Sequence, residues 1–262
     1  MSGTRRTLTP MLDRMDTQQS TSFTTLRFIA EGAKRFSFPN LPRPHVPANE
    51  PATSELVNWG ARVYCFSWLR HLSVLLSGIV TLKDAGNTPS ARIVARSVFE
   101  LGAHAYYVKK HLKQYIDAGN LPAAWKFLTP VTTGSRYINE QYPEETEMFP
   151  ASPHISKAIN CFGERMPEDA QEGYSFLSEF CHPNVLAFSQ YYEWTDPHTV
   201  SFTDDHEPLE GVFGSAAAAS IEGLLAIEEL LRLTCEGEVR GSLHELLEAI
   251  AQNAIKASGA SA

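Results

Sequence analysis

Cysteine is scarce in this sequence, and the spacing of the few present excludes two kinds of scaffold. The 262 residues include 4 cysteines, with no Cys-x-x-Cys pair among them. The sequence therefore predicts neither a disulfide framework nor a zinc ribbon. With 43% hydrophobic residues, the chain can bury a sizeable core without such cross-links.

A long apolar run and an excess of positive charge are also missing. No run approaches the roughly 18 apolar residues of a membrane span, and no apolar segment follows the two arginines near the start. We therefore expect a cytoplasmic protein with no membrane partner. The formal net charge of −8 argues against broad binding to a phosphate backbone, which needs a basic face. A local basic pocket remains compatible with this net charge.

Familiar catalytic and metal-binding motifs are absent from the sequence. It has no glycine-rich phosphate loop, no His-Glu-x-x-His and no nucleophile elbow. Glu179 and His182 have the Glu-x-x-His spacing of di-iron bundles, but the second copy of that pattern is missing. The sequence thus indicates no metal site and no cofactor.

Apolar periodicity predicts an all-α fold, a helical bundle of about four long helices with short satellite helices and an N-terminal extension. One long helix should begin at a cap on Thr53 or Ser54 and run to about Lys83. A second should begin at a cap on Thr88 and run to about Ile116. The short turn between them predicts an antiparallel helical hairpin.

Composition divides the chain into three parts. Residues 1–52 should be an N-terminal extension with a proline-rich connector, residues 53–257 the helical bundle domain, and residues 258–262 a flexible tail. Within the extension, apolar spacing between Ser22 and Phe36 predicts a short helix that docks by one face.

The second half of the bundle domain is predicted from similar signals. Long helices are expected at 214–236 and from 238 to about 256, and a small hairpin near Val200 to Phe202. A further helix should start at Pro167 and reach His182. It either stops there or kinks and continues from 184 to 193.

Two polar stripes at helical spacing form the candidate site. Their side chains should share a face on each of two helices. The stripes consist of Tyr174, Ser178 and His182, and of Arg92, Arg96 and Glu100. If they face one another across a cleft, the arginines would bind an anion and His182 would exchange a proton near neutral pH. Glu228 lies among leucines and should pair with an arginine or accept strong hydrogen bonds, so it joins the predicted ligand-binding set.

A purely structural interpretation of these stripes is also open. The arginines and Glu100 could be a solvated i, i+4 ladder, worth only about 0.3–0.5 kcal/mol per pair. Tyr174, Ser178 and His182 could form a hydrogen-bonded cluster between helices, with a backbone carbonyl holding His182.

Two short motifs support a family resemblance. They are an Arg-Ser-x-x-Glu stretch and a later Tyr-x-x-x-Ser-x-x-x-His-Pro stretch, formed by Arg96, Ser97 and Glu100, then Tyr174, Ser178, His182 and Pro183. In these motifs, the chain resembles an uncharacterised group of bacterial helical proteins distantly similar to HEPN domains (higher eukaryotes and prokaryotes nucleotide-binding). The resemblance implies a bundle related to toxin, antitoxin and defence modules. Many of those cleave RNA through an arginine and a later histidine on one helix, with four to six residues between them.

The chain departs from that cleavage motif. The positions five to seven before His182 hold Leu177, Phe176 and Ser175, and no other histidine has an arginine at that distance. The resemblance therefore implies binding of a nucleotide or RNA without the usual ribonuclease motif.

Three functions of different classes follow. The first, which we favour, is a HEPN-like binding or regulatory module of a bacterial defence or toxin–antitoxin system, recognising a nucleotide or RNA through Arg92, Arg96 and His182. The second is a helical interaction protein that forms homo-oligomers such as a homodimer, with polar stripes that serve packing. The third is an enzyme in which His182 is the general acid or base and Tyr174 or Ser178 positions the substrate.

Overall fold

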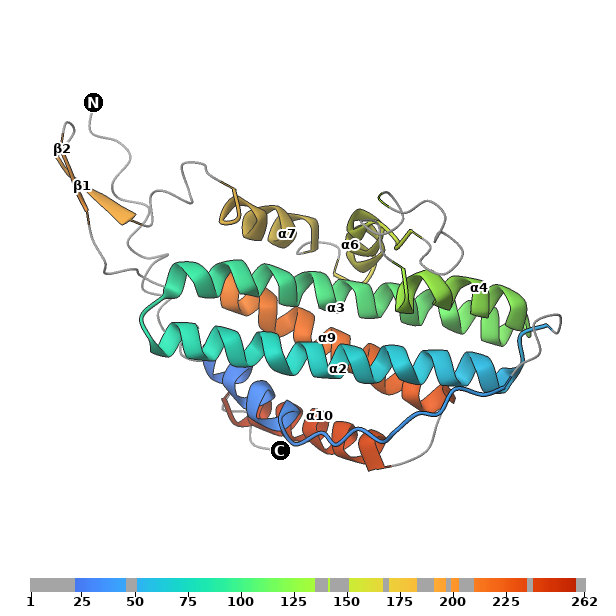
Figure 1. Cartoon of the computed structure of the whole chain (residues 1–262). Coiled ribbons are helices and arrows are strands. Elements are labelled where there is room, and N and C mark those ends of the chain that lie inside the picture. The colour runs from blue at the N-terminus through green and yellow to red at the C-terminus, as the bar shows by residue number, and fades with distance from the viewer. Residues whose placement is uncertain are drawn as a thin grey trace.

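The computed structural model is an all-α bundle, as the amphipathic periodicity of the sequence predicts (Figure 1). The structure describes residues 22–45, 51–134, 141, 151–166, 170–182, 191–196, 199–202, 210–234 and 238–257. The helices are an N-terminal helix at residues 22–33, α2 (Ser54–Asp84), α3 (Thr88–Asp117), α4 (Leu121–Thr132), α6 (Ile155–Gly163), α7 (Ala170–Glu179), α9 (Glu210–Thr234) and α10 (Glu238–Ala257). The predicted fold class is confirmed.

Local sequence signals fix the hairpin of α2 and α3. The Thr53 side chain caps α2 by accepting a hydrogen bond from a backbone N–H three residues on, at 3.2 Å. The cap of α3 is Asn87 and not the predicted Thr88, because the Asn87 side chain reaches the backbone N–H of Ser90 while Thr88 is already helical. Gly86 adopts a φ of 75° in the turn, a conformation that favours glycine.

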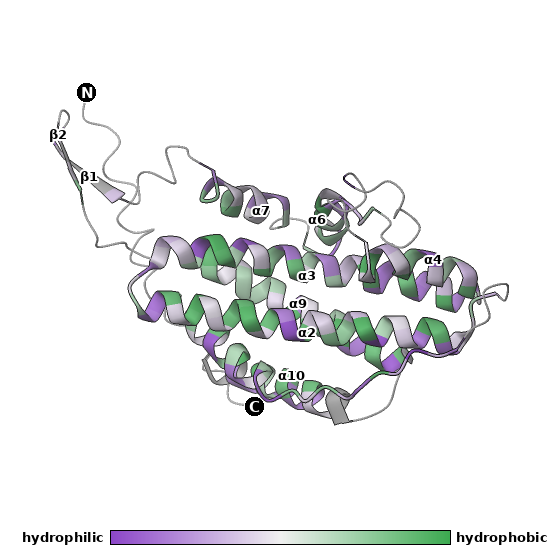
Figure 2. Ribbon diagram, viewed as in Figure 1, coloured by the Kyte–Doolittle hydropathy of each residue, from purple (hydrophilic) through white to green (hydrophobic). Residues whose placement is uncertain are grey.

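Helix α3 lies at the centre of the bundle. It contacts α2, α4, α6, α7 and α9, and α10 packs on α9. In Figure 1, α6 and α7 lie along one side of the α2–α3 hairpin, and α10 and the N-terminal helix lie along the other. Figure 2 shows apolar and polar residues alternating along α2 and α3, as expected for helices that bury one face.

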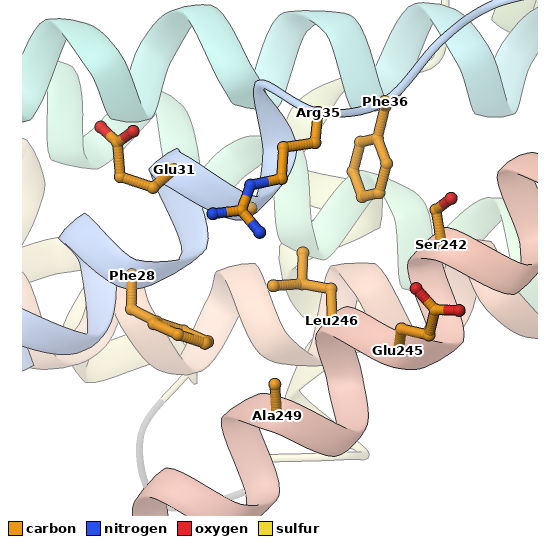
Figure 3. A pocket seen from close by; sticks show the side chains of 9 residues that line it. Phe28, Glu31, Arg35, Phe36, Ser242, Glu245, Leu246 and Ala249 are labelled. Atoms are coloured by element: carbon orange, nitrogen blue, oxygen red, sulfur yellow. The ribbon is translucent and has the colours of Figure 1, made fainter.

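The N-terminal helix shares the core of the bundle. Its residues Leu26 and Ile29 are fully buried in the same apolar cluster as the long helices. Figure 3 shows Leu246 of α10 reaching between Phe28 and Phe36, beside a groove of about 250 Å³. The predicted docking of this segment by one face is thus confirmed, whereas residues 1–21 and the predicted tail at 258–262 lie outside the described residues.

The crossing of α3 and α9 is unusually close. A Cβ on Gly102 of α3 would overlap the backbone oxygen of Ala219 in α9. A Cβ on Gly223 of α9 would lie 3.1 Å from the Gly102 Cα and 2.5 Å from the Trp68 ring of α2. The Trp68 indole N–H donates a hydrogen bond to the Leu101 carbonyl at 2.8 Å. The backbones of α3 and α9 therefore meet, and the buried Trp68 side chain of α2 packs against both.

The segment after α7 differs from the prediction. The helix ends at Glu179, and His182 lies beyond it in a bend, because the residue before a proline disfavours helical geometry. Residues 184–190 lie outside the described part, but Glu193 belongs to a strand, so no helix continues to that position. Strands β1 (Tyr192–Asp196) and β2 (Thr199–Phe202) pair in an antiparallel hairpin, which confirms the expected small hairpin.

By length and composition, α2 could cross a membrane, although no uninterrupted apolar run marks it in the sequence. It is the one helix of that kind in the described ranges, and 39% of its apolar window is buried. It packs against α3, α4 and α9.

We expect Gly102→Ala to lower the free energy of unfolding by about 1–3 kcal/mol, the usual range for overpacking, because the Ala219 backbone cannot move aside easily. The matched control is Gly78→Ala in α2, where a Cβ meets nothing within 4 Å. It should raise stability by up to about 1 kcal/mol through helix propensity. Urea unfolding followed by circular dichroism measures both. Equal effects of the two substitutions would contradict the close crossing.

Candidate functional site

Arg96 links α3 to α7. Its Nε–H donates to a Glu100 carboxylate oxygen at 2.9 Å, and one of its terminal nitrogens donates to the Tyr174 hydroxyl at 3.0 Å. The guanidinium carbon also lies 5.3 Å from the centre of the Tyr174 ring. The two predicted stripes therefore meet at Tyr174 and Arg96, and Arg96 is held at a defined position between the helices.

Arg92 lies one turn earlier on the same face of α3. The residue is only 2% exposed, and its guanidinium carbon lies 5.4 Å from the centre of the Phe180 ring. Burial lowers the pKa of Arg92, and Tyr191 opposes part of that shift. The interpretation of the arginines as a solvated ladder is therefore wrong for Arg92, which is enclosed between α3 and the end of α7.

The surroundings of Arg96 favour its charged form. Burial by itself would lower the pKa of Arg96, but hydrogen bonds to Cys181 and Tyr174, together with the Glu100 charge, raise it above the ordinary value. The side chains of Arg96 and Glu100 are 23% and 28% exposed, so the ion pair is within reach of solvent. A permanent positive charge thus sits at the edge of the α3–α7 interface.

Unlike Tyr174, Ser178 and His182 form no hydrogen bond with α3 in the described part of the chain. The Ser178 hydroxyl donates to the Tyr174 carbonyl in its own helix at 2.7 Å, so it is already satisfied. His182 is exposed, and none of the residues that the structure describes forms a hydrogen bond with it. The alternative in which a backbone carbonyl holds His182 is therefore not seen in that part of the chain.

Glu228 does not join the arginines. Its carboxylate lies 2.7 Å from the His244 Nδ1, so its partner is a histidine of α10 and not an arginine. The hydrogen bond to Glu228, helped by the charge of Glu248, raises the pKa of His244. Since α10 and α7 lie on opposite sides of the α2–α3 hairpin (Figure 1), Glu228 belongs to a different face of the molecule.

Two members of the site were missed by sequence reasoning. Phe180 covers Arg92, and Cys181 contacts Arg96. Cys181 stands seven residues after Tyr174, which is two helical turns, so spacing alone could have placed it on the Tyr174 face. We call the whole group the α3–α7 cluster; it consists of Arg92, Arg96, Glu100, Tyr174, Phe180 and Cys181, with His182 at its rim.

A groove opens beside this cluster. It has a volume of about 420 Å³ and lies between α7 and α9, with Phe99, Phe176 and Glu172 among its lining residues. Phe99 and Tyr174 are stacked, with ring centres 6.4 Å apart and an angle of 28° between planes. Tyr174 thus contacts Arg96 with its hydroxyl and, with its ring, Phe99, one of the residues that line the groove.

The cluster has the chemistry of an anion site. It offers guanidinium groups, a phenol and aromatic faces, while the described residues contain no group of three or more His, Cys, Asp or Glu that could hold a metal ion.

Comparisons with protein-family models, with curated proteins and with solved structures found no match to this chain.

A second polar pair lies deep between α2 and α3. The Tyr64 hydroxyl is 3.0 Å from the His104 Nδ1; Tyr64 is buried and His104 is half-buried. Burial lowers the pKa of His104 and raises the pKa of Tyr64. The pair is therefore neutral at physiological pH.

His182→Ala should change the melting temperature by less than about 2 °C, because replacing an exposed residue usually costs under about 0.5 kcal/mol. Tyr174→Ala removes the contacts to both Arg96 and Phe99 and should lower it by at least about 4 °C. Differential scanning calorimetry at one protein concentration compares them. A large drop for His182→Ala would show that this histidine holds the fold together.

The His104 pair predicts a pH dependence of stability. Since the folded pKa of His104 is lowered, the unfolded chain binds its proton first, near the ordinary value of 6.5. The contribution of neutral His104 to the free energy of unfolding is therefore complete above pH 6.5, and it is lost as the pH falls through the pKa of His104 in the folded protein. We expect the melting temperature of the wild type to fall more between pH 7 and pH 5 than that of His104→Gln, which cannot titrate. Parallel curves would contradict this assignment.

Proposed function

We propose that the protein is a HEPN-like binding module of a bacterial defence or toxin–antitoxin system, and that it recognises a nucleotide or a short stretch of RNA at the α3–α7 cluster. The observation that carries the proposal is the Arg96 guanidinium, held at the partly exposed edge of the interface by Glu100 and Tyr174. The buried Arg92 adds a second positive charge one turn away.

The geometry of Arg96 suits a phosphate. A guanidinium has five N–H donors in a planar fork that matches two phosphate oxygens. The bonds to Glu100 and Tyr174 fix the plane of that fork without using all of its donors. A phosphate can therefore bind to a group that is already oriented, which reduces the entropy lost on binding.

Aromatic side chains beside the arginines suit a base. RNA-binding proteins commonly stack unpaired bases on aromatic rings. Here the groove next to Tyr174 has Phe99 and Phe176 in its wall and a volume of about 420 Å³. The exposed imidazole of His182 lies at the end of the same segment. Together these groups match one nucleotide better than a long duplex, which agrees with the net charge of −8.

Binding is favoured over catalysis by the state of the candidate catalytic groups. The Ser178 hydroxyl is used within its own helix, and the Tyr174 hydroxyl accepts from a permanently charged arginine. Neither is placed beside the His182 imidazole by a hydrogen bond in the described part of the chain. These residues therefore do not form the contact between a nucleophile and a base that usually marks covalent catalysis.

The test is binding of nucleoside monophosphates and of a labelled single-stranded RNA, measured by calorimetry and fluorescence anisotropy. Arg96→Lys keeps the charge but loses the fork, and we expect it to weaken binding about tenfold or more. Because only one or two phosphates are contacted, the affinity should fall weakly with salt.

The matched control is Arg27→Lys. Arg27 also pairs with a carboxylate, that of Asp84, and also lies over an aromatic ring, that of Phe23. It belongs to the N-terminal helix, so its replacement should leave the affinity unchanged. Equal losses for the two arginines, or no binding by the wild type, would overturn the proposed function.

A further inference from the structure

We propose that the cavity between α2, α3 and α4 is a binding site for a small, neutral, largely apolar molecule that carries one hydrogen-bond-accepting oxygen. The cavity is separate from the α3–α7 cluster, and the inference does not depend on the function proposed for that cluster. It rests on the shape of the cavity, on the absence of lysine, arginine, aspartate and glutamate from its wall and on one imidazole nitrogen.

The cavity has a volume of about 200 Å³ and is open to solvent on one side. Three helices contribute to its wall, which consists of Val63, Tyr64, Ser67, Trp68, His71, Leu101, His104, Val131 and Thr132. No lysine, arginine, aspartate or glutamate is among these residues. A charged ligand would therefore lose its hydration without gaining a partner, whereas a neutral ligand on the order of ten heavy atoms fits the space and the chemistry.

Four of the six polar side chains in the wall are already hydrogen-bonded, whereas Ser67 and His71 have no such partner among the described residues. The Trp68 indole N–H donates to the Leu101 carbonyl at 2.8 Å, and the Thr132 hydroxyl donates to the Leu128 carbonyl at 2.9 Å. The Tyr64 hydroxyl and the His104 Nδ1 are bonded to each other. These groups shape the cavity but do not require a ligand.

The tautomer of His104 follows from the Tyr64 bond. The Tyr64 phenol stays protonated, and Nδ1 is its only hydrogen-bond partner among the described residues, so its O–H donates to that nitrogen. In a neutral imidazole the proton must then be on the Nε2. The Nε2–H has no partner in the described part of the chain, and an acceptor that enters the cavity can bind to this half-buried donor.

Aromatic surfaces set the preferred shape of the ligand. The indole of Trp68 lies in the wall, and the rings of Tyr64 and His104 lie 5.7 Å apart at 47°. A planar molecule can stack on such surfaces while its oxygen meets the imidazole. An aromatic ketone has this combination of a flat apolar body and a single acceptor.

The experiment compares two probes of nearly equal shape on the full chain. Acetophenone carries the oxygen, and α-methylstyrene has a methylene group in its place. Binding is followed by the nitrogen and proton shifts of the His104 imidazole in a ¹⁵N-labelled sample. We expect a saturable shift of the Nε2 signal with acetophenone and at least about fivefold weaker binding of α-methylstyrene, because one hydrogen bond is lost.

Two variants locate the site. Ser67→Phe places a ring in the mouth of the cavity from an exposed position and should abolish the shift. Ser97→Phe is the matched control, because Ser97 is exposed on α3 and does not line the cavity. Each variant is checked for wild-type circular dichroism before titration.

The outcomes separate cleanly. A saturable shift that depends on the oxygen and is blocked by Ser67→Phe alone supports the proposal. Absence of saturation would mean that water alone occupies the cavity and would overturn it. Equal affinity for the two probes would overturn the role of the His104 donor, and so would an Nδ1-protonated tautomer in the spectrum.

Discussion

The close approach of α3 and α9 is the constraint on which the rest of the bundle depends. Gly102 and Gly223 let two helical backbones come together: the Ala219 backbone lies where a Gly102 side chain would be, and the Trp68 ring lies where a Gly223 side chain would be. The indole then donates to the Leu101 carbonyl, so the tryptophan is fixed by packing and by a hydrogen bond. Because interiors are close-packed, a contact of this kind determines the positions of all helices that touch α3.

The candidate site follows from that central position of α3. One face of the helix is occupied by α9, and another carries Arg92 and Arg96 toward α7. An arginine enclosed in the protein loses hydration, which is costly unless polar or aromatic groups replace it. Phe180 lies over Arg92, and Tyr174 and Glu100 bind Arg96. Packing alone does not require two guanidinium groups in this interface, one of them at its partly exposed edge.

Two chemically different regions therefore lie on α3. Arg96 and Tyr174 mark a charged edge next to α7, whereas His104, two turns farther along, marks a cavity next to α2 and α4 that no lysine, arginine, aspartate or glutamate lines. The two regions differ because Arg96 and His104 have different neighbours. Arg96 has a carboxylate beside it, and burial without a charged partner keeps His104 neutral.

The sequence by itself determined most of the helices and the cap of α2. Apolar spacing, Thr53, and the turn around Gly86 predicted the α2–α3 hairpin, because these signals act within one or two helical turns. The same reasoning placed Arg96 and Tyr174 on helix faces, but it could not show that they meet. Only the tertiary structure decided that Arg92 is buried and that Glu228 pairs with His244 on another face. Those outcomes depend on contacts between residues far apart in the chain, and the spacing of residues within a helix carries no information about them.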